Sequence, residues 1–70
     1  MKYTVVIERA SDGSFSAYVP DLPGCVSCGD TQDEVLDSME EAVRGHIETL
    51  RENDEPIPEP RSTAAVINAA

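Results

Sequence analysis

The residue types that could do chemistry in this chain are two cysteines, one histidine and many carboxylates. Cys25 and Cys28 have the CxxC spacing of half a zinc site or of a redox pair. A zinc site needs four ligands, and the only histidine, His46, lies far along the sequence. A redox cysteine belongs at a helix N-terminus, which lowers the thiol pKa, whereas the helix here is expected to begin after Cys28. Because strand positions three apart point to opposite faces, we expect two ordinary strand cysteines and no bound metal.

The carboxylates are numerous but poorly arranged for catalysis. Metal-dependent phosphoryl transfer needs several acids that converge on one point, usually from strand centres. The centres of the first two expected strands, Val5-Val6 and Ala17-Tyr18, carry no acid. His46 has no nucleophile to activate, and the chain has neither a glycine-rich phosphate loop nor a nucleophile elbow. We therefore expect no enzyme, no catalytic residue and no cofactor, and a metal-dependent nuclease is the least favoured alternative.

Hydrophobic periodicity and turn signals predict the strands and the helix that position these residues. Together they predict one α+β domain over residues 1–70. The expected order is β-β-β-α-β. It comprises strands over residues 2–9, 15–19 and 25–28, a helix over about 31–53, an extended proline-rich connector over 56–60, and a fourth strand over 62–68. The alanines of the last segment are equally compatible with a frayed tail.

Three local sequence signals predict how these elements are joined and capped. A three-residue loop after the first strand places Val5, Ile7, Ala17 and Val19 on one side of the sheet, with Gly13 at positive φ. Pro23-Gly24 is typical of a type II turn. Thr31 and Glu34 form a capping box, in which Glu34 is expected to reach back to the Thr31 N–H. Gly13, Pro23, Gly24, Thr31 and Glu34 are thus expected to be structural residues.

The expected helix is longer than the strands that it covers. About 22 residues span roughly 33 Å in a helix, whereas strands of five to seven residues span about 17–23 Å. The apolar stripe of the helix is formed by Leu36, Met39, Val43, Ile47 and Leu50, flanked by Val35, Ala42 and His46. Its last turns are expected to overhang the sheet, which predicts a homodimer or higher homo-oligomer.

The charge of the chain is strongly negative and local. Fourteen acids and five basic residues give a net charge of −9, and residues 30–55 alone hold ten acids and two arginines, or −8. Such a chain repels phosphate backbones, so no direct nucleic-acid binding is expected. The acids are consistent with a solvated helix face and also with attraction to a basic partner. No apolar run resembles a signal peptide or a membrane span, which predicts a cytoplasmic protein.

The sequence resembles the HicB antitoxin family over essentially its whole length. The most specific part is Tyr-Val-Pro-Asp-Leu-Pro-Gly-Cys at residues 18–25. It is followed at the family's distances by Gly29-Asp30-Thr31, which opens an acidic helix, and by the proline-rich exit at residues 56–60. The resemblance implies a partial RNase H-like fold, with three antiparallel strands and a fourth strand parallel to the first.

The resemblance also implies a function. HicB proteins neutralise HicA toxins, small basic ribonucleases that cleave messenger RNA, so the expected partner is a HicA-like toxin. The alternative is a stand-alone oligomerisation or ligand-binding domain with no toxin. Many HicB proteins continue into a DNA-binding domain, whereas this chain stops at Ala70, so autorepression by this chain is not expected. The residues expected to bind a partner are Asp37, Glu41 and Glu48 on the helix, and Val6 and Tyr18 on the sheet.

Overall fold

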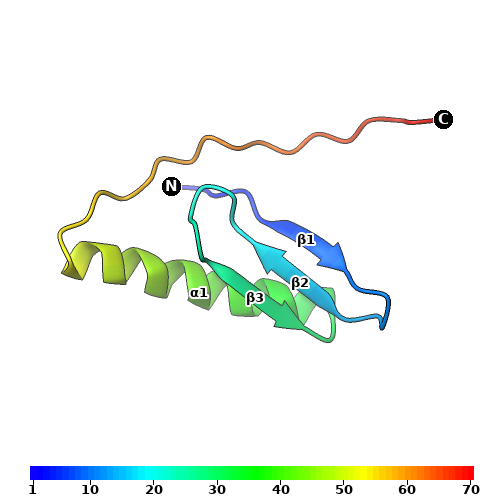
Figure 1. The fold of residues 1–70 in the computed structure, drawn as a ribbon, viewed down its shortest axis with the longest axis horizontal. Coiled ribbons are helices and arrows are strands. Elements are labelled where there is room, and N and C mark those ends of the chain that lie inside the picture. The colour runs from blue at the N-terminus through cyan, green and yellow to red at the C-terminus, as the bar shows by residue number, and fades with distance from the viewer.

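The computed structural model describes residues 1–70 and has two layers, a sheet and one helix. The strands are β1 (Val6–Arg9), β2 (Phe15–Tyr18) and β3 (Val26–Gly29), and the helix is α1 (Gln32–Glu52). The strands form an antiparallel sheet in the order β1-β2-β3. The helix covers one face of the sheet, mainly at β3 and β2, and its C-terminal turns extend past the strands (Figure 1). The α+β class and the overhanging helix are confirmed.

The β1–β2 hairpin has the predicted register. Ile7 pairs with Ala17 and Val6 pairs with Tyr18, so the odd-numbered side chains share the face toward the helix. The loop is Ser11–Gly13, closed by the Ala10 N–H, which donates to the Ser14 carbonyl at 2.8 Å. Gly13 has φ 89°, a conformation that side chains with a Cβ rarely adopt. The local turn chemistry therefore determines which residues enter the core.

The strands are shorter than predicted, and β1 begins at Val6 instead of residue 2. Continuing the register would place Thr4 opposite Pro20, which has no backbone N–H to donate. The ladder therefore ends, and Tyr3 and Thr4 bond to another segment. The Tyr3 hydroxyl donates to the Pro58 carbonyl, and the Thr4 hydroxyl donates to the Ser62 carbonyl at 2.7 Å.

The segment between β2 and β3 carries an apolar side chain into the core. The Cys25 N–H donates to the Leu22 carbonyl at 3.0 Å, and Gly24 has φ 84°, so the turn predicted at Pro23-Gly24 is confirmed. The turn inserts Leu22, which is fully buried. The other buried residues are Ala17, Val19, Cys25, Val35 and Met39.

The core-facing line of α1 differs from the predicted stripe by one residue. Val35 and Met39 are buried, whereas Leu36 is 37% exposed. The cause is the junction between β3 and the helix, because a Cβ on Gly29 would lie 3.0 Å from the Val35 nitrogen. This close approach fixes the rotation of the first turn. The spacing of apolar residues along the helix cannot predict that contact.

The N-terminal cap of α1 is formed as predicted on one side only. The Glu34 N–H donates to the Thr31 hydroxyl oxygen at 3.1 Å. The Glu34 carboxylate accepts from the Asp30 N–H at 3.0 Å, one residue before the predicted donor. Both bonds satisfy backbone donors that the helix leaves free at its start. Thr31 and Glu34 therefore both hold backbone N–H groups at the start of α1.

The helix ends at the predicted place through two backbone bonds beyond Asn53. The Glu55 N–H donates to the Leu50 carbonyl at 2.8 Å, and the Asp54 N–H donates to the Arg51 carbonyl at 3.1 Å. This is a Schellman motif, in which glycine usually occupies the left-handed position. Here that position is held by Asp54, with φ 53°.

Replacement of Asp54 by glycine is therefore expected to stabilise the domain. Removal of the Cβ at a positive φ should raise the free energy of unfolding by about 0.5–1 kcal/mol. Urea denaturation followed by circular dichroism measures the change. The matched control is Asn53→Gly, where φ is −92° and glycine gives no such relief. Equal effects of the two substitutions would contradict the explanation.

The structure does not show the predicted fourth strand over residues 62–68. This segment is extended but forms no ladder, and Val66 and Ile67 are 100% and 85% exposed. Figure 1 shows the segment running past the N-terminus and away from β1. Four of the last seven residues are alanines, which strands disfavour. The sequence of residues 62–68 therefore favours strand pairing with β1 only weakly.

The start of this segment is held by one carboxylate. Asp21 accepts from the Arg61 and Ser62 N–H groups at 2.9 Å and from the Ser62 hydroxyl at 3.0 Å. Hydrogen bonds hold the pKa of Asp21 below its ordinary value of 3.8. The largest contribution comes from the Ser62 backbone N–H, and the next from the Arg61 backbone N–H. A lowered carboxyl pKa gives stabilisation that is present above the unfolded pKa and is lost as pH falls through the folded pKa.

Acid is therefore expected to release the segment. The amide resonances of Arg61 and Ser62 should move together on acidification, with a midpoint below 3.8. NMR titration measures this midpoint. Asp21→Asn should abolish the common titration, because the amide side chain does not ionise. A midpoint at or above the ordinary carboxyl value would show that Asp21 does not hold the segment.

Candidate partner-binding surfaces

Three exposed acids of α1 form one line along the helix. Asp37, Glu41 and Glu48 are all exposed. Spacings of four and seven residues return to nearly the same side of a helix. That side is opposite Val35 and Met39, which face the sheet. We call Asp37, Glu41 and Glu48 the acidic stripe. The structure thus brings these three predicted residues together.

The acidic stripe is not neutralised within the chain. The only salt bridge joins Arg44 to Glu40 at 3.9 Å, and both side chains are largely exposed. Such an exposed pair contributes little to stability, and it involves none of the stripe residues. The carboxylates of the stripe are therefore free to pair with cations supplied by a partner.

The two predicted sheet residues lie on the other side of the domain. Val6 pairs with Tyr18, and Tyr18 pairs with Val26 on β3, so the three side chains form a row on the face away from α1. Tyr18 is 39% exposed and Val26 is 64% exposed. We call this the outer sheet row. Sequence reasoning missed Val26, because its pairing depends on the β2–β3 register. The five predicted partner-binding residues therefore belong to two surfaces, not one.

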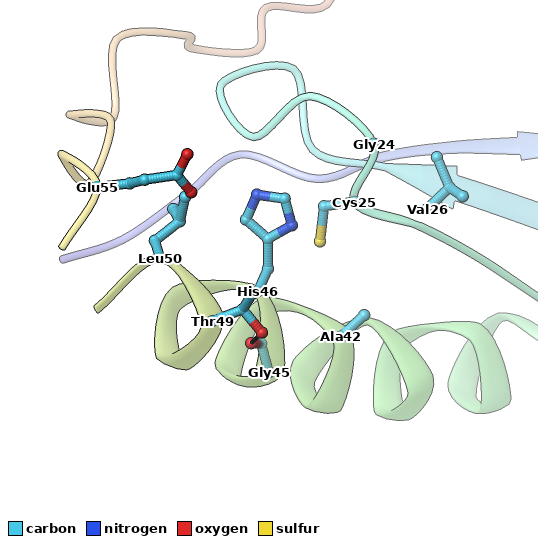
Figure 2. Close-up of a pocket in the computed structure, with 9 residues that line it drawn as sticks. All are labelled: Gly24, Cys25, Val26, Ala42, Gly45, His46, Thr49, Leu50 and Glu55. Carbon is cyan, nitrogen blue, oxygen red and sulfur yellow. Dashed lines mark hydrogen bonds between the residues drawn. The ribbon is translucent and has the colours of Figure 1, made fainter. Parts of the chain in front are cut away.

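A cavity of about 360 Å³ lies beside the overhanging end of α1. Figure 2 shows the imidazole of His46 turned toward the Cys25 thiol, with the Glu55 carboxylate on the other side of the ring. These residues come from the β2–β3 connection, the helix and the segment after it. The sequence analysis treated Cys25 and His46 separately, and only the tertiary fold brings them together.

The chemistry available in this cavity is limited. Burial raises the pKa of the Cys25 thiol, so the thiol stays protonated, whereas a nucleophile needs a lowered pKa. Cys28 is exposed on the opposite face of β3, so the CxxC cysteines point apart as predicted. No three histidine, cysteine or acidic side chains are grouped closely enough to hold a metal ion. The cavity is suited to packing against a side chain, not to attack on a substrate.

The chain has no helix with the length and apolar character that a membrane crossing requires.

Comparison with known proteins gives a consistent result. Residues 3–70 match a family model described as the HicB_like antitoxin of bacterial toxin-antitoxin systems. A UPF0150 protein of Thermoplasma acidophilum is 41% identical over 99% of this chain and 100% of its own length. Antitoxin HicB 1 of Photorhabdus laumondii is 33% identical over 86% of this chain, which corresponds to 39% of that protein. The relatives whose names state a role are antitoxins, not enzymes.

A solved structure supports the same comparison. The N-terminal domain of the Burkholderia pseudomallei antitoxin HicB superposes with a TM-score of 0.80 and 33% identity. The match covers 90% of this chain and 74% of that chain. An uncharacterised protein of Haemophilus phage HP1 is 41% identical over 97% of this chain, but the match spans only 50% of the phage protein. The similarity thus spans nearly all of this chain but only part of some of its relatives.

Proposed function

Because the chain belongs to the HicB-like antitoxin family, we propose that it binds and neutralises a HicA-like, mRNA-cleaving toxin in the cytoplasm. The observation that carries the proposal is the acidic stripe, a line of three carboxylates that no residue of the chain neutralises. Neutralisation by binding needs no catalytic residue in the antitoxin. It needs a surface that the toxin prefers to its substrate.

The stripe is chemically suited to a ribonuclease. An enzyme that binds RNA presents arginine and lysine side chains to phosphates. Carboxylates on one face of a helix can pair with the same cations, and Asp37 and Glu41 are about 6 Å apart along the axis. The net charge of −9 also attracts a basic protein over longer distances and speeds association. The helix would thereby occupy the toxin surface that RNA needs.

Co-expression in bacteria tests the proposal. The proposal predicts that a small basic protein is encoded beside this chain and that it arrests growth when expressed alone. Growth should recover when this chain is co-expressed, and the two proteins should co-purify. The proposal is wrong if this chain is abundant and folded in the cells, does not co-purify with that protein, and leaves the arrest unchanged.

A further inference from the structure

The segment after Ser62 is an exposed, uncharged arm. We define the arm as residues 63–70, all of which are exposed. Val66 and Ile67 are 100% and 85% exposed, and the arm carries no charged side chain. These two adjacent apolar side chains are not packed against their own domain and are available to pack against another surface.

The start of the arm is fixed next to β1. Asp21 holds the Ser62 backbone and hydroxyl, and the Thr4 hydroxyl donates to the Ser62 carbonyl. Thr4 lies two residues before β1 begins. From this anchor the arm does not continue along its own β1 but leaves the domain (Figure 1). Each chain therefore has an extended arm and, next to the point where the arm is held, the free edge of β1. The arm does not pair with that edge of its own chain.

The strand edge has an apolar surface next to it. β1 is at the edge of the sheet and pairs only with β2. Because α1 lies mainly beneath β3 and β2, a groove of about 600 Å³ remains between residues 1–5 and the helix. Val5, Leu36 and Val43 are among its lining residues, and Leu36 is 37% exposed.

The arm matches this edge. Neighbouring residues of a strand point to opposite faces, so a strand added at β1 would direct Val66 and Ile67 to different sides of the sheet. One of them would lie on the helix side, next to the groove, and the other would lie beside Val6 of the outer sheet row. The unpaired backbone groups of β1 would gain hydrogen-bond partners at the same time.

We infer that the arm of one copy adds to β1 of a second copy as its fourth strand, and that the second copy returns its own arm. Reciprocal exchange of an identical element closes a two-fold dimer and leaves neither copy with a free arm. The fourth strand that the sequence predicts would then be supplied by the partner copy. This inference concerns self-association and does not rest on the proposed toxin.

The charge distribution favours this mode of self-association. Two copies with a net charge of −9 repel each other, so a contact through α1 would bring like charges together. The arm has no charged side chain, and the acidic stripe faces away from the sheet. An arm-to-edge contact therefore joins the copies without placing one acidic stripe against the other, and leaves both stripes free.

Sedimentation of the full chain tests the dimer. The unchanged chain is expected to be a dimer at micromolar concentration, and the double variant Val66→Asp/Ile67→Asp is expected to be a monomer with unchanged helix content. The control Val26→Asp/Gln32→Asp adds the same charge at exposed positions outside the arm and β1, and it should remain a dimer. A monomeric unchanged chain, or a dimer that survives the arm substitutions, would overturn the inference.

A mixed-label NMR experiment decides whether the strand comes from the same chain or from the partner, and it uses the unchanged sequence. Isotope-labelled and unlabelled chains are mixed, and contacts between the two kinds of chain are recorded. Val66 and Ile67 methyl groups should show contacts to β1 residues of the other chain. Contacts to β1 found only within one chain would overturn the inference, whatever the fate of the variants.

Discussion

Lysine at Asp37, Glu41 and Glu48 is expected to weaken toxin binding at least about 100-fold, because close charge pairs at such interfaces contribute about 1.5–7 kcal/mol each. The substitutions change the acidic stripe from attractive to repulsive for a basic partner, while their exposure leaves the core intact. Titration calorimetry with the purified toxin measures the dissociation constant. The loss should become smaller at high salt, because exposed charges are screened.

The control for this prediction has the same charge. Lysine at Glu8, Asp30 and Glu59 also replaces three exposed acids, so both triple variants change the net charge from −9 to −3. Loss of long-range steering, which can lower the association rate by about 10- to 1,000-fold, is shared by both variants, so the stripe variant should bind the toxin more weakly than the control by the loss of its direct charge pairs. Equal losses in the two variants would show that net charge matters and the stripe does not. If the stripe variant binds normally and Tyr18→Asp does not, the outer sheet row is the binding surface.

Alanine at Leu22 is expected to have the largest effect on stability. Leu22 is fully buried by the turn at Pro23-Gly24, and its truncation leaves a cavity among core residues. Such a change lowers the free energy of unfolding by about 2–5 kcal/mol. A 70-residue domain has a total of roughly 4–10 kcal/mol, so a substantial part of the stability would be lost. Urea denaturation followed by circular dichroism measures it.

Leu36 provides the matched control, because the same truncation occurs at a side chain that is 37% exposed. Leu36→Ala should cost less than about 1.5 kcal/mol, in proportion to the smaller apolar area removed from the folded state. If the two substitutions had equal effects, the assignment of Leu22 to the core would be wrong. If Leu36→Ala also retains toxin binding, the Leu36 side chain, which lines the groove, is not needed for that binding.

The parts of the fold that the sequence predicted are those with local causes. The loop ending at Gly13, the turn at Pro23-Gly24 and the cap at Thr31 each follow from residues that are adjacent in the chain. The parts that it did not predict depend on contacts between distant residues. The rotation of α1 depends on the approach of Gly29 to Val35, and the start of β1 at Val6 depends on Pro20 across the ladder.

For the candidate binding surfaces, too, the sequence predicted only the parts that have local causes. Helical spacing was sufficient to place Asp37, Glu41 and Glu48 on one line, because all three belong to one element. Pairing of Tyr18 with Val26, and the meeting of Cys25 with His46, needed the register and the tertiary packing. The fourth strand has the weakest local signal, since four of the last seven residues are alanines, which are depleted in strands.

The proposed role of this chain is to neutralise a ribonuclease by covering its basic surface. The most direct measurement is cleavage of a messenger RNA by the purified neighbouring toxin, with increasing amounts of this chain. Cleavage should cease near one chain per toxin, and the variant with lysine at Asp37, Glu41 and Glu48 should leave it unaffected at the same ratio. Cleavage that continues unchanged in an excess of the folded chain would contradict the claim and would favour a stand-alone oligomerisation or ligand-binding domain.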